Sequence, residues 1–316
     1  MPFAALGIAG MLRGAAGLLL PRGDGEETVY CHFERRFGRS VADRLASPFV
    51  SGIWAGDARR LVARHAFPTL FGARREGKRG HRLLSFRGGL SALPRALASG
   101  LGDRSRAGVG VSEIVRRDGG FSVSTSLGEV RCERLVVATS ASEAARLSAG
   151  IAPAASEALS RVYAPPLAVA HCAWNAGDFD RPLAGFGHLV VPGEARILGA
   201  VWSSCLFPGR APGGQVLITV FLGGTLHPEI ASLPEEQILA SVDEDARRVL
   251  GARRPPRLLR VTRHAAAIPQ YDGGHGALLA ALDFTEREIP GLRFLGNYRG
   301  GVSVPDVVDS AISSAG

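Results

Sequence analysis

The spacing of apolar residues changes part-way along the chain, and the change predicts two kinds of structure. Up to about residue 85, apolar residues recur with a helical period. Gly38 suits the C-terminal end of the helix "EETVYCHFERRFG", and Ser40 suits the N-cap of the next helix, "VADRLASPFVSGIW". A Gly-Gly turn then precedes a helix with Leu93 and Leu97 on one face. The first part of the chain is therefore predicted to be helical.

From about residue 109 the pattern becomes typical of strands. The segment "GVGVSEIVRRDGGFSVSTSLGEVRC" predicts three short strands, separated by turns at 118–120 and 127–128. The next segment, "RLVVATSA" (134–141), is continuously apolar and leads into a helical stretch. Such a strand is typical of a parallel α/β sheet, in which both faces of the strand are buried.

Between residues 162 and 270 the sequence predicts a sheet and one long helix. The strand candidates are "PLAVAHCAW", "FGHLVVP", "RILGAVW", "QVLITVFLGG" and "RLLRVTRHAAAIPQ". The helix is predicted to begin at a capping box formed by Ser232 and Glu235. Its apolar stripe comprises Ile238, Leu239, Val242, Ala246 and Val249.

The composition is that of a globular protein, and it argues against a nucleic-acid partner. Hydrophobic residues make up 46% and charged residues 21% of the 316 residues. The net charge is +8, but all but one of the 37 basic residues are arginines, scattered singly or in pairs without interleaved aromatic residues. We therefore expect no nucleic-acid partner. The positive charge favours acidic surfaces or carboxylated substrates.

The cysteines and histidines predict neither disulfides nor a metal site. The four cysteines lie far apart without a CxxC pair, and the eight histidines show no metal-ligand spacing. This favours a reducing, cytoplasmic location. The apolar start of the chain is interrupted by Arg13 and is too short to cross a bilayer comfortably. We interpret it as a core helix, with a peripheral helix on the inner membrane surface as the alternative.

Several catalytic and nucleotide-binding signatures are absent from the sequence. Residues 72–79, "GARREGKR", match seven positions of a phosphate-binding loop, but Arg79 stands where Ser or Thr must hold magnesium. No apolar strand precedes this segment, so we interpret it as a solvated loop. No GxSxG, HExxH or complete GxGxxG occurs. The sequence therefore identifies no catalytic acid, base or nucleophile.

The segment "FLGNYRGGVSVPDVVDSA" (294–311) combines an apolar run, a Gly-rich turn and a capped helix. Ser303 suits the N-cap and Pro305 the first helical position, with Asp306 in the first turn. The N–H groups of Val302, Ser303 and Val304 are expected to face negative charge near the helix N-terminus. A flavin suits this geometry, because negative charge grows at its N1–C2=O edge on reduction. The alternative is an ordinary Gly-rich turn.

Five segments, in order, resemble the protoporphyrinogen/coproporphyrinogen oxidase family of the flavin amine oxidase superfamily. Besides residues 294–311, they are "ERRFGRSVADRLASPFVSGIWAGD", "LLSFRGGLSALPRAL", "GFGHLVVP" with "ILGAVWSSCLFPGRAP", and "AAAIPQYDGGH". The resemblance covers nearly the whole chain. It implies FAD-dependent oxidation of a porphyrinogen to a porphyrin in haem biosynthesis, with oxygen as the acceptor.

The resemblance also implies an α/β (α+β) fold with a discontinuous FAD domain, a mixed-sheet substrate domain and a helical domain. Residues 1–85 would form most of the helical domain, which meets the membrane in several family members. Residues 86–145 and 266–316 would belong to the FAD domain, and residues 146–265 to the substrate domain. A partner chain or a homodimer is a further expectation.

The cofactor residues implied by the resemblance lie in two parts of the chain. Val111 matches the position whose backbone meets the adenine, and Ala138 and Thr139 would lie at the end of a nearby strand. The motif positions at the flavin are Gly296, Asn297, Gly301, Val302, Ser303, Val304 and Asp306.

The substrate residues implied by the resemblance are apolar. Phe186, Leu189 and Phe221 match positions that sandwich the tetrapyrrole, although ordinary sheet packing explains an aromatic strand residue equally well. No residue reads as a general acid or base. The sequence does not choose between a substrate with two propionates and one with four.

The sequence departs from the family pattern at its start. Family members open with a strand, GxGxxG and a helix that hold the FAD pyrophosphate, whereas the resemblance here begins after that unit. Either the gene model starts late, a partner chain supplies the unit, or the protein is a remnant. Without this βαβ unit the parallel sheet would expose apolar edges, and we predict weak or absent FAD binding by the chain as given. The other readings are a non-catalytic tetrapyrrole-binding protein, or another amine oxidase or desaturase.

Overall fold

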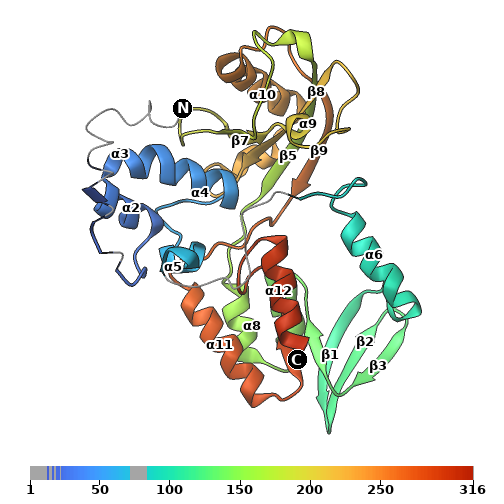
Figure 1. Ribbon diagram of the computed structural model, residues 1–316. Helices are drawn as coiled ribbons and strands as arrows, with labels where there is room; N and C mark the ends of the chain where they lie inside the picture. The colour runs from blue at the N-terminus through green and yellow to red at the C-terminus, as the bar shows by residue number, and fades with distance from the viewer. Residues whose placement is uncertain (1–12, 14–15, 18, 22, 72–83, 316) are drawn as a thin grey trace. The chain divides into compact units, whose positions relative to one another are not determined.

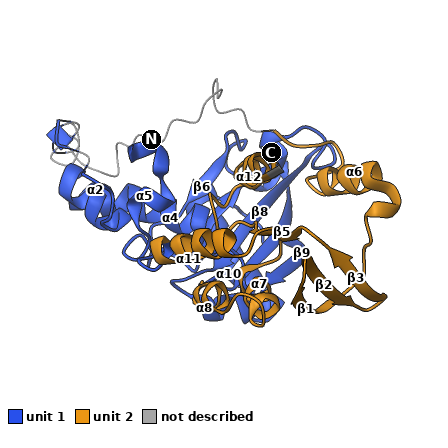
Figure 2. Ribbon diagram, turned by 90° about the horizontal axis from the view of Figure 1, so that it is seen from below, with its two compact units in different colours: residues 1–73, 163–275 blue, residues 74–162, 276–316 orange. Residues whose placement is uncertain are grey.

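The computed structural model describes residues 13, 16–17, 19–21, 23–71 and 84–315. The chain forms two compact units, each made from two separate stretches (Figure 2). Unit 1 comprises residues 1–73 and 163–275, and unit 2 comprises residues 74–162 and 276–316. The three domains implied by the resemblance, which occupy four segments, follow a different division and stay a prediction. The loop at 72–79 and most of the apolar N-terminal segment lie outside the described residues.

Unit 1 is built around a five-stranded sheet with strand order β6–β7–β8–β5–β9 (Figure 1). The strands are β5 (Leu167–Asn175), β6 (Gly187–Leu189), β7 (Ile197–Val201), β8 (Gln215–Gly223) and β9 (Arg257–His264). All five lie in segments that were predicted as strands. Every pairing is antiparallel, whereas the resemblance implies a mixed sheet. Alternate residues of β5 and β8 are buried on one face, among them Cys172 and Ile218.

The long helix α10 (Glu235–Leu250) covers that buried face (Figure 1). Ile238 and Val242 of its predicted stripe are buried against the sheet. The predicted capping box is wrong, because Ser232 ends a 3-10 turn and Pro234 occupies the N-cap without a side-chain hydrogen bond. Two glutamates in the first turn instead complement the helix dipole.

The first part of the chain is helical, as predicted. The remaining helices of unit 1 are α2 (Val29–Phe37), α3 (Arg39–Val41), α4 (Ser47–Trp54), α5 (Ala63–Ala66) and α9 (Ser203–Leu206). Gly38 ends α2 with a φ of 89°, which glycine adopts without strain. Ser40 lies inside α3 instead of capping it, because Gly38 also holds that N-cap position. A π-helical turn joins α3 to α4. None of the described helices is long and apolar enough to cross a bilayer.

Unit 2 contains a meander, a short parallel sheet and several helices. The strands β1 (Val111–Arg117), β2 (Gly120–Thr125) and β3 (Gly128–Cys132) form the predicted antiparallel meander. The strand β4 (Leu135–Val137) pairs in parallel with β10 (Leu292–Phe294), which confirms the predicted parallel arrangement. The helices are α6 (Ala92–Leu101), α7 (Ala141–Ser148), α8 (Pro153–Ser160), α11 (His275–Glu288) and α12 (Val304–Ala315).

The parallel sheet and three helices of unit 2 share one core. Val137 and Phe294 are buried in the sheet, next to Leu159 of α8 and Leu282 of α11. Val136, by contrast, is 51% exposed, so the prediction that this strand is buried on both faces is wrong at that residue. Within the described part of the chain, β4 has β10 as its one neighbouring strand.

Candidate functional site

The residues predicted to bind the flavin lie at the carboxyl ends of the two parallel strands of unit 2. Ala138 and Thr139 follow β4 directly, and Gly296 and Asn297 follow β10 after one residue. The N–H of Leu295 donates to the last carbonyl of β4 at 3.0 Å, which continues the pairing to the strand ends. Open α/β sheets bind ligands at this edge. The structure therefore brings four predicted cofactor residues to one edge of the sheet.

A capping box closes the Gly-rich turn at the start of α12. Ser303 is the N-cap, as predicted: the Asp306 N–H donates to Ser303 Oγ at 3.3 Å, and the Ser303 N–H donates to Asp306 Oδ2 at 3.2 Å. Pro305 is the second helical residue and not the first. Gly300 and Gly301 have φ values of 82° and 129°, and a Cβ on Gly301 would lie 2.5 Å from Asp306 Oδ2. Glycine is therefore required in this turn.

The capping box decides which backbone groups of the turn can reach a ligand. The Ser303 N–H, one of the three expected at the flavin, is bonded to Asp306. The N–H groups of Val302 and Val304 find no acceptor among the described residues, and Val304 is 52% exposed. The negative charge of the Asp306 carboxylate at this helix N-terminus repels a bound anion. The turn therefore fits a neutral flavin edge that accepts hydrogen bonds better than it fits a pyrophosphate.

Arg299 fixes the turn to α11. Its guanidinium lies 2.5 Å from Glu286 Oε1 and 2.5 Å from Asp283 Oδ1, and it donates to the Phe294 carbonyl at 3.1 Å. Glu286 is 10% exposed and also accepts from the Phe294 N–H at 2.8 Å. Tyr298 is fully buried beside it, and burial raises its pKa. This anchor was not predicted from the sequence.

Val111, predicted to lie near the adenine, begins β1 and is tied to α7. Arg146 of α7 donates to the carbonyl of Val111 at 2.8 Å and to that of Ser112 at 2.9 Å. Glu143, one turn earlier, accepts from Arg146 Nε at 3.0 Å. Because α7 begins just after Thr139, one helix connects Val111 with the end of β4. The contact of Val111 with adenine stays a prediction.

In unit 1, the strand register places two of the three predicted substrate residues in one row. The paired residues of this row, which we call the apolar row, are Leu189, Gly199, Phe221, Val169 and Thr262. A Cβ on Gly199 would lie 3.3 Å from Leu189 Cδ2, so glycine leaves room between Leu189 and Phe221. Phe221 is half-buried against a small apolar cluster. Phe186 precedes β6 and is 56% exposed.

Leu189 also lines an apolar groove of 660 Å³ in unit 1. The groove is bordered mainly by residues of α2, the α3–α4 segment and the turn after α5, including Phe33, Phe49 and Phe67. Arg44 is the one charged residue among its described lining residues. Phe186 and Phe221 do not line it. A groove of this size and character suits part of a large apolar ring.

His188 links β6 to α10, a link that was not predicted from the sequence. Its Nε2 lies 2.8 Å from Asp245 Oδ2, and its Nδ1 accepts from Trp202 Nε1 at 3.3 Å. The proton of the neutral ring is therefore on Nε2, and it is donated to the carboxylate. The Trp202 backbone N–H also donates to the Phe186 carbonyl at 2.9 Å. These bonds fix the short edge strand that carries Leu189.

The segment "AAAIPQYDGGH" packs in unit 1 through an aromatic cluster. Tyr271 stacks on His275 with ring centroids 3.7 Å apart, and His65 lies 4.9 Å from His275. The Gln270 amide donates to the Trp54 carbonyl at 2.9 Å. Burial, and then the neighbouring His65, lowers the pKa of His275 to about 4. His275 is therefore a neutral, buried ring at pH 7.

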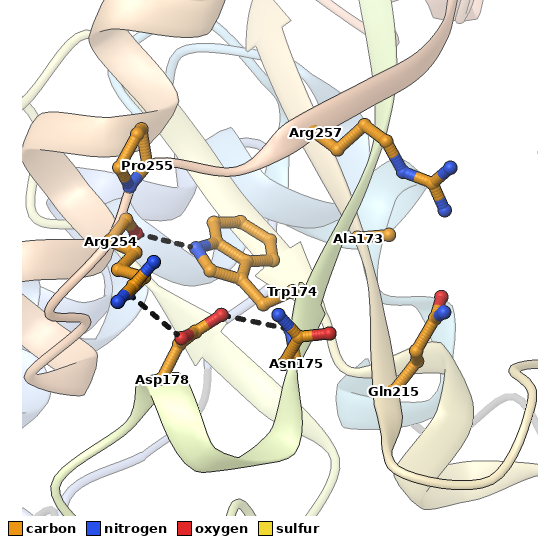
Figure 3. A pocket seen from close by; sticks show the side chains of 8 residues that line it. All are labelled: Ala173, Trp174, Asn175, Asp178, Gln215, Arg254, Pro255 and Arg257. Atoms are coloured by element: carbon orange, nitrogen blue, oxygen red, sulfur yellow. Dashed lines mark hydrogen bonds and ion pairs between the residues drawn. The ribbon is translucent and has the colours of Figure 1, made fainter.

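A polar pocket of 380 Å³ lies where β5 ends and β8 and β9 begin (Figure 3). Arg254 lies 3.8 Å from Asp178, whereas Arg257 has no ion pair within the described residues. Figure 3 shows Arg257 and Gln215 on either side of Ala173. Arg257 is therefore the one charged residue without an ion pair among the described residues that line this pocket. Among the residues that the structure describes, no three His, Cys, Asp or Glu side chains come together as metal ligands.

Comparison with known proteins identifies the family. The sequence profile of flavin containing amine oxidoreductases matches residues 6–316. The chain belongs to this family. Its members are oxidoreductases that carry a flavin, and FAD is the cofactor expected from the sequence. The match confirms the predicted superfamily and cofactor class.

Relatives by sequence are protoporphyrinogen oxidases. The chain is 30% identical to protoporphyrinogen oxidase 1 of Spinacia oleracea, over 96% of this chain and 62% of the relative. It is 31% identical to protoporphyrinogen oxidase of Bos taurus, over 98% and 75% of the two chains. It is 31% identical to protoporphyrinogen oxidase of Homo sapiens, over 96% of this chain and 71% of the relative. These matches confirm the resemblance described above. The chain spans about two thirds of the length of the plant relatives.

Solved structures confirm the fold class. A structure from Exiguobacterium sp. matches with a TM-score of 0.79 at 20% identity, covering 98% of this chain and 72% of that one. Cyclohexylamine oxidase of Brevibacterium oxydans matches with a TM-score of 0.68 at 13% identity, covering 100% and 75%. At these identities the likeness concerns the fold alone.

Proposed function

We propose that the protein oxidises a porphyrinogen, protoporphyrinogen IX or coproporphyrinogen III, to the porphyrin in haem biosynthesis. FAD would take up the hydrides and oxygen would be the final acceptor. One observation carries the proposal: the 31% identity to the bovine protoporphyrinogen oxidase extends over 98% of the chain, and thus over both units. A match confined to unit 2 would fit any flavin enzyme of this family.

The residues of unit 2 would hold FAD by its ring. Bound FAD supplies a two-electron acceptor for hydride removal. The N–H groups of Val302 and Val304 are available to the ring edge, and Gly301 lets the backbone approach closely. Asp306 serves the turn by capping α12. Asn297 and Thr139 remain candidates for contacts at the same sheet edge.

The residues of unit 1 would bind the tetrapyrrole. Leu189 and Phe221 offer an apolar surface to the macrocycle, and the groove beside Leu189 excludes water from it. Phe186 directly precedes β6, next to the apolar row, and would cover the end of that row. No side chain is assigned as a catalytic acid or base.

A second candidate is a tetrapyrrole-binding protein that needs another chain for turnover. The pairing of β4 with a single strand in the described residues favours weak FAD binding by this chain alone. An amine oxidase or desaturase is less favoured, because relatives matching both units are protoporphyrinogen oxidases.

The test uses the purified chain with protoporphyrin IX, with FAD, and with protoporphyrinogen plus saturating FAD in air. We expect porphyrin to bind and its fluorescence to appear from porphyrinogen faster than in a protein-free control. Gly301→Val, which brings a side chain against Asp306, should slow formation and leave porphyrin binding unchanged. Porphyrin binding without oxidation would favour the second candidate. If neither porphyrin nor porphyrinogen bound, both proposals would be wrong.

We also propose peripheral membrane contact, and a partner chain or a homodimer. Phe49 and Ile53 of α4 are 43% and 47% exposed beside the groove, and the chain carries a net charge of +8. Both features support contact with an anionic lipid surface. Co-sedimentation with anionic vesicles, compared with neutral vesicles, tests this proposal.

A further inference from the structure

The row of residues beside the apolar row is polar on β8, β5 and β9. Its paired residues are Gly187, Val201, Thr219, His171 and Arg260, and we call it the polar row. It lies on the same face of the sheet, because its members stand two residues away from those of the apolar row. Neighbouring rows of one face are about 7 Å apart. A ligand of porphyrin size on the apolar row therefore reaches the polar row.

Three side chains at the polar row form a short hydrogen-bonded chain. Thr219 Oγ1 lies 3.1 Å from His171 Nδ1 and 2.9 Å from Ser203 Oγ. When the His171 ring is neutral, His171, Thr219 and Ser203 each carry one polar hydrogen. Two of these three hydrogens are used in the two hydrogen bonds, Thr219–His171 and Thr219–Ser203. One donor therefore remains, and it can be the His171 Nε2–H or the Ser203 O–H. The remaining acceptor near Ser203, the Val201 carbonyl, is 3.5 Å away and binds weakly.

Arg260 places a positive charge next to this chain. It pairs with His171 across β5 and β9, is exposed, and has no ion pair within the described residues. Burial, and then the charge of Arg260, lowers the pKa of His171. The ring is therefore neutral at pH 7 and offers a hydrogen bond, while Arg260 supplies the charge. A spare donor beside a guanidinium is the combination that binds carboxylates.

We propose that the polar row binds a carboxylate of the substrate while the apolar row contacts its macrocycle. This rests on the proposed function, since porphyrinogens carry propionate groups at the edge of an apolar ring. Arg260, His171 and Thr219 then fix the orientation of the ring on the sheet. The class of ligand is a cyclic tetrapyrrole with a free carboxylate, and the esterified form is the disfavoured analogue.

The test compares protoporphyrin IX with its dimethyl ester, each titrated into the purified chain and followed by fluorescence. The ester keeps the macrocycle and removes the charge. We expect the free acid to bind about tenfold more tightly, the usual value of a charged hydrogen bond. Arg260→Gln should reduce this preference to about twofold and leave the affinity for the ester unchanged. Thr219→Val, which keeps the shape and removes the hydroxyl, should reduce it by a smaller factor.

Matched controls separate the polar row from other effects. Arg263→Gln removes an equal charge from the same strand, opposite the core-facing Ala168, and should leave the preference intact. Phe221→Ala should weaken acid and ester alike. Equal binding of acid and ester by the wild type would overturn the inference and leave the proposed function standing. So would an equal loss of ester affinity in Arg260→Gln, or a loss of preference in Arg263→Gln. If neither porphyrin bound and no porphyrinogen were oxidised, the proposed function itself would fail.

Discussion

The Gly-rich turn of unit 2 and the substrate face of unit 1 are organised by different means. In the turn, the interacting residues lie within five positions of one another: Ser303 and Asp306 exchange hydrogen bonds, and Gly301 makes room for them. On the substrate face, Leu189 and Phe221 come together only through the register of β6, β7 and β8. The first arrangement is local in sequence, and the second is not.

This difference determines how each region responds to change. A local turn tolerates changes elsewhere, provided that its anchor to the core remains. A row across five strands depends on every strand that defines its register. Substitutions that test the anchor, the buried rings and the edge strand should therefore have effects of different size and in different units.

The largest effect is expected from Arg299→Met, which removes the anchor of the turn. The carboxylate of Glu286, 10% exposed, would lose its principal partner. We expect a loss of about 3 kcal/mol in the stability of unit 2, since breaking a buried pair leaves an unpaired charge. Amide hydrogen exchange of β10 and α12 measures it. Arg131→Met, at an exposed pair with Glu129, should change exchange little. Equal effects of the two substitutions would contradict the anchor.

An effect of about the same size is expected in unit 1 on acidification. His275 has a pKa of about 4 when folded and about 6.5 when unfolded, so the unfolded state binds more protons between these values. The neutral His275 ring makes its full contribution to the stability of unit 1 above pH 6.5, and this contribution is lost as the pH falls toward 4. The loss amounts to about 3 kcal/mol.

Urea unfolding followed by tryptophan fluorescence reports this loss, because all three tryptophans lie in unit 1. His275→Phe keeps an aromatic ring against Tyr271 and should remove most of the dependence on pH. Some slope should remain, since burial also lowers the pKa of His32 and His65. A variant with the full slope of the wild type would show that another group is responsible.

His188→Phe should destabilise unit 1 by about 2 kcal/mol, because the buried Asp245 Oδ2 loses its hydrogen-bond donor and only Arg248 remains, 3.5 Å from the other oxygen. Asp245→Leu in the same chain should restore part of this loss. The double-mutant cycle, read by urea unfolding, therefore measures the coupling directly. His264→Phe, at the exposed end of β9, is the matched control, and a loss as large as that of His188→Phe would count against the link.

The smallest effect is expected from Ser303→Ala. Loss of the N-cap hydroxyl should cost about 1 kcal/mol, confined to α12. Amide exchange in the first turn of α12 should increase, while exchange in β10 stays unchanged. Ser303→Asp, which supplies another capping oxygen, should recover part of the protection. Increased exchange throughout unit 2 would mean that the cap supports more than its own helix.

The sequence predicted what depends on nearby residues. The meander, the parallel strand at 134–141, the end of α2 at Gly38 and the N-cap at Ser303 all follow from short patterns. The failures at Ser40 and Ser232 arose where a neighbouring glycine or proline took the cap position. Both errors concern one or two residues at a helix end.

Long-range pairs could not be predicted from the sequence. His188 meets Asp245 across 57 positions, and neither residue stands in a recognisable spacing. The polar row needs the register of four strand pairs, which no local signal fixes. Arg299 is a partial exception, since Asp283 and Glu286 stand three residues apart on one face of α11, a helix that was not predicted from the sequence. Two carboxylates on one helix face could have predicted a basic partner such as Arg299.

The pairing of β4 with β10 also has a consequence for how the protein is made. During synthesis, residues 135–137 leave the ribosome long before residues 292–294 exist. Parallel pairings between distant segments form slowly, because the loop must close before any contact is gained. The apolar edge of β4 is thus open while the whole of β5 to β9 is being translated. A nascent chain that stalls before residue 292 would present this edge to chaperones or to other chains.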